Sequence, residues 1–313
     1  MKPKIAFYWC AACGGCEECI LDLAEEILPL VETVDIVFWP VAVDFKEKDI
    51  AAMPDGSIDV CFLNGSIRTT HQQEMAHLLR AKAKALLAFG ACAQMGGIPG
   101  LANLYHTEGI MEASYGNGPR PQGEYKANGY TLHLPRLFET VLPADRVVPV
   151  DYYVPGCPPT IKVIRAALRM LLSGEERPPL GSVLSPNYAL CEECPRRATK
   201  PDAAIVERIR RVHQVEIDQQ TCLLAQGIMC LGPATRAGCE ARCPTGNMPC
   251  TGCFSATGRV RDFGAKALSA VATAVSANDE DAVDRALEDV ADPAGTFYRY
   301  TMAGSFLERK GEE

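Results

Sequence analysis

Cysteine is the residue whose number and spacing point most directly to chemistry in this chain. The 313-residue sequence holds 15 cysteines, many of them in Cys-x2-Cys pairs or followed by proline. The chain opens with MKPKIAFYW and shows no signal peptide, no twin-arginine leader and no apolar stretch of about 20 residues. We therefore expect a cytoplasmic protein without membrane insertion. In a reducing cytosol, clustered thiols serve as metal ligands or redox groups rather than as disulfides.

Four cysteines follow predicted strands at what should be one edge of a parallel sheet. Cys13 and Cys16 come after the first apolar run, Cys92 after the fourth and Cys157 after the fifth. The carboxyl ends of parallel strands share one edge, and ligands bind there. Four thiolates gathered at one place match the ligand set of a 4Fe–4S cluster.

Alternatives to a cluster at this edge are a thioredoxin-like redox pair and a zinc ion, which also accepts four thiolates. Cys92 and Cys157 at matching strand ends favour a cluster over a redox pair, and Gly14 and Gly15 would let backbone amides approach its sulfur without an intervening Cβ. The Gly-Gly pairs do not form G-x-G-x-x-G, so no dinucleotide site is predicted. Cys61 lies inside an apolar run and is expected to be a core residue.

A second group of eight cysteines lies between residues 191 and 253, where strand signals are few. Eight thiols make two sets of four, and the prolines after Cys194 and Cys243 are typical of ferredoxin-type sites. Two zinc ribbons are the alternative. The apolar pattern is too weak for an ordinary core, so metal should take part in folding this segment.

The elements that would position these thiols alternate between strand and helix in the first half of the chain. Strands are predicted at 4–9, 34–40, 58–64, 85–90 and 147–151, and helices at 16–31, 70–83 and 160–172. This alternation predicts an α/β fold, a flavodoxin-like doubly wound parallel sheet in residues 1–180. Residues 98–143 are expected to form a loop with a short helix, and residues 174–185 a linker.

The remainder, residues 185–313, is predicted to be a smaller, cysteine-rich, mostly helical or irregular iron–sulfur domain, with a helical stretch at 264–291. Hydrophobic residues make up 48% of the chain, enough for a buried core. The net charge of −8 excludes the basic surface that a nucleic-acid partner requires.

Together these motifs resemble the small subunit of nickel–iron hydrogenases. The resemblance is strongest to the cytoplasmic, methyl-viologen-reducing (F420-non-reducing) type found with heterodisulfide reductase, and it extends over nearly the whole chain. The segments that carry it are Cys13-Gly-Gly-Cys16-Glu17, Gly90-Ala-Cys92-Ala, Gly96-Gly-Ile-Pro-Gly100, Pro155-Gly-Cys157-Pro-Pro159, Cys191-Glu-Glu-Cys194-Pro-Arg196, Gln226-Gly227, Cys230-Leu-Gly-Pro-Ala-Thr235, Pro249-Cys250-Thr-Gly-Cys253 and Gly295-Thr-Phe-Tyr298.

This resemblance implies an electron relay with no catalytic residue in this chain. It assigns a proximal cluster to Cys13, Cys16, Cys92 and Cys157, a medial cluster to Cys239, Cys243, Cys250 and Cys253, and a distal cluster to Cys191, Cys194, Cys222 and Cys230. Many exported relatives have histidine at the position of Cys191 and proline at that of Cys243. Cysteine at both positions implies three 4Fe–4S clusters here.

Two further cysteines, Cys10 and Cys19, flank the proximal motif and depart from the family pattern. Cys10 is expected to be a thiol at the end of a strand, and Cys19 lies one helical turn beyond Cys16. The alternative is that one or both ligate a modified proximal cluster. Glu17 is expected either to hydrogen-bond near a subunit contact or to be a solvated carboxylate at the start of a helix.

The resemblance also implies partners. A large subunit would carry the nickel–iron centre and the chemistry on hydrogen, and a further electron-transfer subunit or a heterodisulfide-reductase-like complex would accept electrons. One alternative is an electron conduit in a hydrogenase-like oxidoreductase whose large subunit lacks the nickel–iron site. Another is the related subunit of a quinone-reducing complex, which shares the first site but lacks the eight-cysteine tail. A zinc-dependent interaction module is the last.

Overall fold

The computed structural model describes residues 2–116, 123–172, 176–203, 205–277 and 279–307. Within it the chain forms two compact units. The first runs from the N-terminus to Leu184 and includes the chain again from Met302, while the second is Ser185–Thr301. The sequence predicts instead that everything after residue 185 forms the second domain. The return at Met302 differs because the turn Met302–Gly304 packs against the segment Ile98–Leu104 of the first unit.

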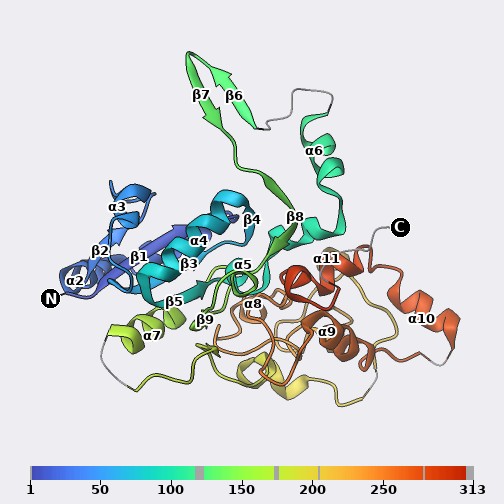
Figure 1. Cartoon of the computed structure of the whole chain (residues 1–313). Helices are drawn as coiled ribbons and strands as arrows, with labels where there is room; N and C mark the ends of the chain where they lie inside the picture. Colours follow the sequence, from blue (N-terminus) through green and yellow to red (C-terminus); the bar gives the residue numbers. More distant parts are fainter. Residues whose placement is uncertain (1, 117–122, 173–175, 204, 278, 308–313) are drawn as a thin grey trace. The chain divides into compact units, whose positions relative to one another are not determined.

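A six-stranded parallel sheet forms the centre of the first unit (Figure 1). In spatial order its strands are β10 (Ser182–Val183), β9 (Tyr152–Val154), β5 (Ala83–Phe89), β3 (Ile58–Asn64), β1 (Lys4–Trp9) and β2 (Asp35–Phe38). The chain passes from β1 to the edge strand β2, returns beyond β1 to β3, and then continues outward. This is the doubly wound order predicted from the sequence, and the α/β fold class is confirmed.

Helices connect the strands of the sheet. They are α1 (Gly15–Leu21), α2 (Ile27–Thr33), α3 (Glu47–Ala51), α4 (Thr70–Lys82), α5 (Ala91–Met95), α6 (Thr107–Tyr115) and α7 (Ile161–Leu172). Because side chains alternate along a strand, one set of strand residues packs with Ile50 of α3 and Leu79 of α4 in a single apolar cluster. The alternate set includes Phe7, whose ring stacks on that of Phe62 at 4.9 Å. Burial on both faces explains why these strands read as continuous apolar runs.

Three predicted elements differ in the structure. The fifth strand is Tyr152–Val154 rather than 147–151, because Pro149 interrupts the earlier run and cannot donate to a ladder. The predicted helix at 16–31 is divided between α1 and α2, with Ala24 in a left-handed conformation at φ 51°. The predicted linker contributes the two-residue strand β10 to the sheet.

The segment 98–143 contains more structure than the predicted loop with a short helix. Besides α6 it holds the antiparallel hairpin of β6 (Glu124–Ala127) and β7 (Tyr130–His133), which stands out from the sheet in Figure 1. It also holds β8 (Leu137–Leu142), which pairs antiparallel with β4 (Ile67–Thr69).

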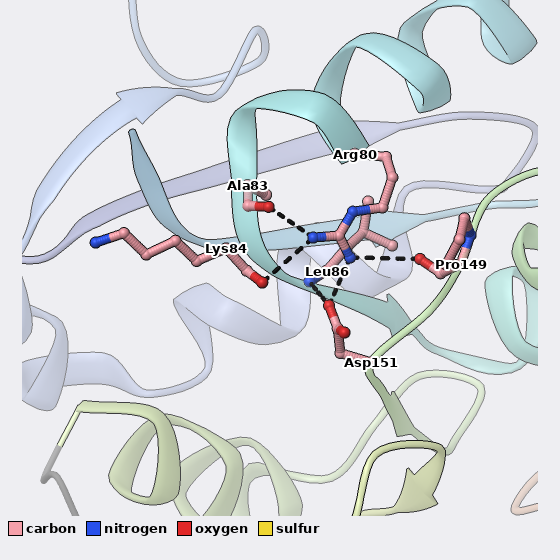
Figure 2. Close-up of polar contacts among 6 residues, drawn as sticks. All are labelled: Arg80, Ala83, Lys84, Leu86, Pro149 and Asp151. Atoms are coloured by element: carbon pink, nitrogen blue, oxygen red, sulfur yellow. Dashed lines mark hydrogen bonds and ion pairs between the residues drawn. The ribbon is translucent and has the colours of Figure 1, made fainter. Parts of the chain in front are cut away.

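The end of α4 is fastened to the chain that enters β9, as Figure 2 shows. The Arg80 guanidinium donates to Asp151 Oδ2 at 2.5 Å and to the carbonyl oxygen of Ala83 at 2.6 Å. The same Asp151 oxygen accepts the backbone N–H of Leu86 at 2.7 Å. One half-buried ion pair therefore links α4, β5 and the segment that leads to Cys157.

The second unit has no extended sheet among its described residues, and its helices are short. They are α8 (Arg242–Thr245), α9 (Phe263–Ala272), α10 (Glu280–Leu287) and α11 (Pro293–Phe297). The stretch 264–291, predicted to be helical, contains α9 and α10. One apolar cluster surrounds α9, and a second contains the sulfur atoms of Cys230 and Cys250 among leucine side chains. In the described chain, no helix is long and apolar enough to span a bilayer.

Candidate iron–sulfur sites

The first candidate site lies where three strands of the parallel sheet end. Cys13 precedes α1 and Cys16 lies in its first turn, Cys92 lies in α5 directly after β5, and Cys157 follows β9. Gly14, at φ 89°, turns the chain into α1, and a Cβ there would lie 2.9 Å from the Trp9 ring. The turn therefore requires glycine, for a different reason from the amide approach expected from the sequence.

The electrostatics of the thiols show that these four cysteines are neighbours. The pKa of Cys16 is raised by burial first and then by the nearby thiols of Cys19, Cys92, Cys157 and Cys13. The pKa of Cys92 rises to about 12 through burial, Cys157 and Cys13. A cation would reverse this preference, because a metal-bound thiol gives up its proton. The set is suited to iron.

Two glycines to which the sequence analysis gave no role lie directly against these thiols. A Cβ on Gly90 would lie 2.3 Å from Cys16 Sγ, and one on Gly97 would lie 2.4 Å from Cys92 Sγ. Both have positive φ, at 87° and 58°. A side chain at either position would therefore displace a thiol of this set. The sequence signal that could have identified these two glycines is their position in the motifs Gly90-Ala-Cys92-Ala and Gly96-Gly97 around Cys92.

Glu17 is buried beside the first site, so its interpretation as a solvated carboxylate is wrong. Its two carboxylate oxygens accept hydrogen bonds from Trp39 Nε1 at 2.8 Å and from Asn64 Nδ2 at 2.9 Å. Burial raises the pKa of Glu17, and the two hydrogen bonds oppose that rise. The carboxylate links α1 to the ends of β2 and β3.

The extra cysteines differ in position. Cys10 belongs to the apolar cluster on one face of the sheet, and burial and the thiol of Cys61 raise its pKa. Burial raises the pKa of Cys61 to about 12. Cys19 lies closer to the site, since its thiol donates to the carbonyl oxygen of Cys16 at 2.9 Å. Cys10 and Cys61 are thus packed as core residues, and Cys19 lies against the backbone of a candidate ligand.

A second set of thiols lines one small pocket in the second unit. Its walls include Cys191, Cys194, Cys222 and Cys230. The pKa of Cys191 rises to about 12, chiefly through burial, with Lys200 opposing and the other three thiols adding to the rise. The sulfur of Cys230 accepts backbone N–H groups from Cys250, at 3.3 Å, and from Gly232. Amide hydrogen bonds of this kind tune iron–sulfur clusters.

The remaining four cysteines affect one another in two pairs, Cys239 with Cys243 and Cys250 with Cys253. Burial raises the pKa of Cys239, and the thiol of Cys243 adds to the rise. Burial and then the thiol of Cys230 raise the pKa of Cys250, with a smaller contribution from Cys253. Glu240 and Ala241 are both left-handed, at φ 59° and 48°, and this turn aims the N–H groups of Ala241 and Arg242 at Cys239 sulfur. None of the described His, Cys, Asp or Glu side chains gather as three or more around a position for a single metal ion.

Comparison with known proteins identifies the family. Residues 13–171 match the family model described as NADH ubiquinone oxidoreductase, 20 Kd subunit. The chain is 36% identical over 99% of its length, and 99% of the relative's, to the iron-sulfur subunit of the F420-non-reducing hydrogenase of Archaeoglobus profundus. This chain belongs to the hydrogenase small-subunit family. As a hydrogenase small subunit it is part of an oxidoreductase, and the family implies a large-subunit partner.

Other relatives of this small subunit agree. It is 37% identical, over its full length and 99% of the relative's, to a vhu subunit of the F420-non-reducing hydrogenase of Methanocaldococcus jannaschii. A chain of the [NiFeSe] hydrogenase of Dm. baculatum shares the fold, with a TM-score of 0.53 at 18% identity over 82% of this chain and 95% of that one. The family model ends in α7, before the eight-cysteine segment. The full-length relatives extend over that segment as well.

Proposed function

We propose that this chain is the electron-transfer small subunit of a [NiFe] hydrogenase-type complex, relaying electrons through three 4Fe–4S clusters. The observation that carries the proposal is the convergence of Cys13, Cys16, Cys92 and Cys157, from separate elements, around glycines whose Cβ atoms would strike the thiols. The 36% sequence identity to a hydrogenase iron-sulfur subunit, over 99% of both chains, supports the same role. When bound, each cluster supplies one-electron transfer.

Twelve cysteines of the chain would form three ligand sets. Cys13, Cys16, Cys92 and Cys157 hold the cluster nearest the large subunit. The other two clusters would be held by the sets Cys239, Cys243, Cys250, Cys253 and Cys191, Cys194, Cys222, Cys230. Burial and N–H groups aimed at sulfur, such as those on Cys230 and Cys239, set how readily each site accepts an electron.

The large subunit would carry the nickel–iron centre and the chemistry on hydrogen. Electrons would pass between it and an external acceptor or a heterodisulfide-reductase-linked one, in the cytoplasm. Purification of the complex without oxygen tests this proposal. Nickel in the partner, together with bleaching of this chain's iron–sulfur absorbance under hydrogen, is expected. A complex whose clusters stay oxidised under hydrogen would contradict the proposal.

A second function keeps the relay and changes the terminal chemistry. The family model carries the description of an NADH ubiquinone oxidoreductase subunit, so the first unit's pattern is not confined to hydrogenases. In this case the chain would be a conduit in a hydrogenase-like oxidoreductase whose partner lacks the nickel–iron site. The partner's sequence separates the two, because a nickel–iron centre needs metal-binding cysteines in the large subunit.

A further inference from the structure

Arg196 is a buried cation in the wall of the pocket that Cys191, Cys194, Cys222 and Cys230 line. Its side chain is 4% exposed, and it follows the Cys194-Pro195 motif. A buried charge is costly unless it is paired or fully hydrogen-bonded. Its partners are therefore informative.

The terminal nitrogens of Arg196 are satisfied by uncharged oxygens. Nη1 donates to the backbone carbonyl oxygens of Asp218 and Thr221, at 3.1 and 3.2 Å, and Nη2 donates to Asn247 Oδ1 at 2.6 Å. The pKa of the Asp218 carboxyl is lowered chiefly by hydrogen bonds from Thr221 and Gln220. The nearby guanidinium of Arg196 makes a smaller contribution to this lowering. That carboxylate accepts those hydrogen bonds itself, and Arg196 reaches only the carbonyl of Asp218.

The Nε atom of Arg196 is buried and has no hydrogen-bond partner among the described residues. Leaving such a buried donor unpaired destabilises the fold. Arg236, another buried arginine of the same unit, shows the usual outcome. Its Nε donates to the carbonyl oxygen of Ala256 at 3.0 Å, and its Nη1 to those of Ser185 and Pro186. The described lining of the cysteine pocket does not include Arg236.

We propose that the Nε–H of Arg196 is a hydrogen-bond donor to the cluster held by Cys191, Cys194, Cys222 and Cys230, and that its charge favours the reduced form. The inference rests on the proposed function, which places a cluster in this pocket. Sulfur of a cluster is a hydrogen-bond acceptor, and reduction adds one negative charge beside the guanidinium. Arg196 is therefore a positioning and tuning residue, and it raises the potential of one cluster of the three.

The test is a redox titration, followed by electron paramagnetic resonance, of the oxygen-free complex with Arg196→Gln, Arg196→Lys or Arg236→Gln. For Arg196→Gln, we expect the reduced-to-oxidised ratio of one cluster to fall about tenfold at a fixed potential, equivalent to ~59 mV for one electron. The other two clusters should not move. Arg196→Lys keeps the charge but lacks Nε, so its shift should be smaller and in the same direction. Arg236→Gln should lower the melting temperature and leave all three midpoints in place.

Iron content separates the outcomes. Loss of one cluster's iron from Arg196→Gln, with full content in Arg236→Gln, would also support the proposal, because the missing donor is then needed to hold the cluster. Unchanged midpoints in a fully loaded Arg196→Gln protein would overturn it, as would equal shifts or equal iron loss in both glutamine variants. A wild-type complex with fewer than three clusters would instead contradict the proposed function.

Discussion

Gly90 and Cys16 approach each other so closely that a Cβ on the glycine would lie 2.3 Å from the cysteine Sγ. Gly90→Ala must therefore displace the thiol, and we expect a folded protein that has lost the iron of one cluster. Gly56→Ala is a control for positive φ without a steric contact, since Gly56 has a φ of 66° and nothing lies within 4 Å of the new Cβ. The backbone penalty is larger at Gly90, whose φ of 87° and ψ of 166° are adopted almost exclusively by glycine, so circular dichroism of both variants must accompany the iron analysis. Iron analysis of both variants checks this, and equal iron in the two would refute the role assigned to Gly90.

The ion pair of Arg80 and Asp151 should stabilise the first unit. Arg80→Ala leaves Asp151 half-buried without its cation and frees the carbonyls of Ala83 and Lys84, so we expect a loss of about 2 kcal/mol in unfolding free energy. Arg165→Ala breaks the exposed pair with Glu26 and should cost less than about 1 kcal/mol. Denaturant unfolding measures both changes. A loss in Arg80→Ala no greater than that in Arg165→Ala would contradict this prediction.

Cys10 and Cys61 should be dispensable for iron. Both lie in the apolar cluster of the sheet, so Cys10→Ala and Cys61→Ala should keep the full iron content and lose about 1 kcal/mol of stability. Cys19→Ala is the sharper case, because its thiol contacts the backbone of Cys16. We expect the electron paramagnetic resonance spectrum of Cys10→Ala to match that of the wild type. A changed proximal signal in Cys19→Ala alone would make Cys19 part of the first site.

Asp59 should contribute stability that depends on pH. Burial pushes the pKa of its carboxyl upward, but hydrogen bonds from Lys84 Nζ at 2.7 Å and from the backbone N–H of Lys4 at 2.8 Å outweigh it and hold the pKa below its usual value. The folded pKa is thus below the unfolded one, about 3.9. The contribution is present above that value and is lost as the pH falls through the folded pKa.

Asp59→Asn should remove this contribution. The difference in unfolding free energy between wild type and variant should be largest near neutral pH and shrink below about pH 4. Asp55→Asn is the control, since the Asp55 side chain is 75% exposed in its pair with Lys82 and little change is expected. Urea unfolding across this range measures the difference. A constant gap at all pH values would exclude the ionised carboxylate as its source.

The sequence was sufficient for the sheet order, because continuous apolar strands alternating with helices leave few topologies. It also placed Cys13, Cys16, Cys92 and Cys157 at the carboxyl ends of strands, and the structure has them there. Their role as a ligand set stays a prediction. The sequence was not sufficient where the signals were short. The hairpin of β6 and β7 turns at Asn128-Gly129, with φ of 51° and 81°, so a typical hairpin signal stands within the segment expected to be a loop. The two residues of β10 are too few for any periodicity.

Packing explains the other differences. Gly90 and Gly97 contact thiols from remote parts of the chain, and the burial of Glu17 depends on Trp39 and Asn64. Neither relationship can be read from local sequence. In the second unit the clustered cysteines were evident from spacing alone, whereas the unpaired Nε of Arg196 required the positions of Asp218, Thr221 and Asn247.

Iron and acid-labile sulfide quantitation, with zinc measured in parallel, on the chain purified without oxygen tests the central claim most directly. Three 4Fe–4S clusters predict about twelve irons and about twelve sulfides per chain, with little zinc. A colourless protein that contains zinc and no labile sulfide, or one with about four irons per chain, would contradict the three-cluster relay.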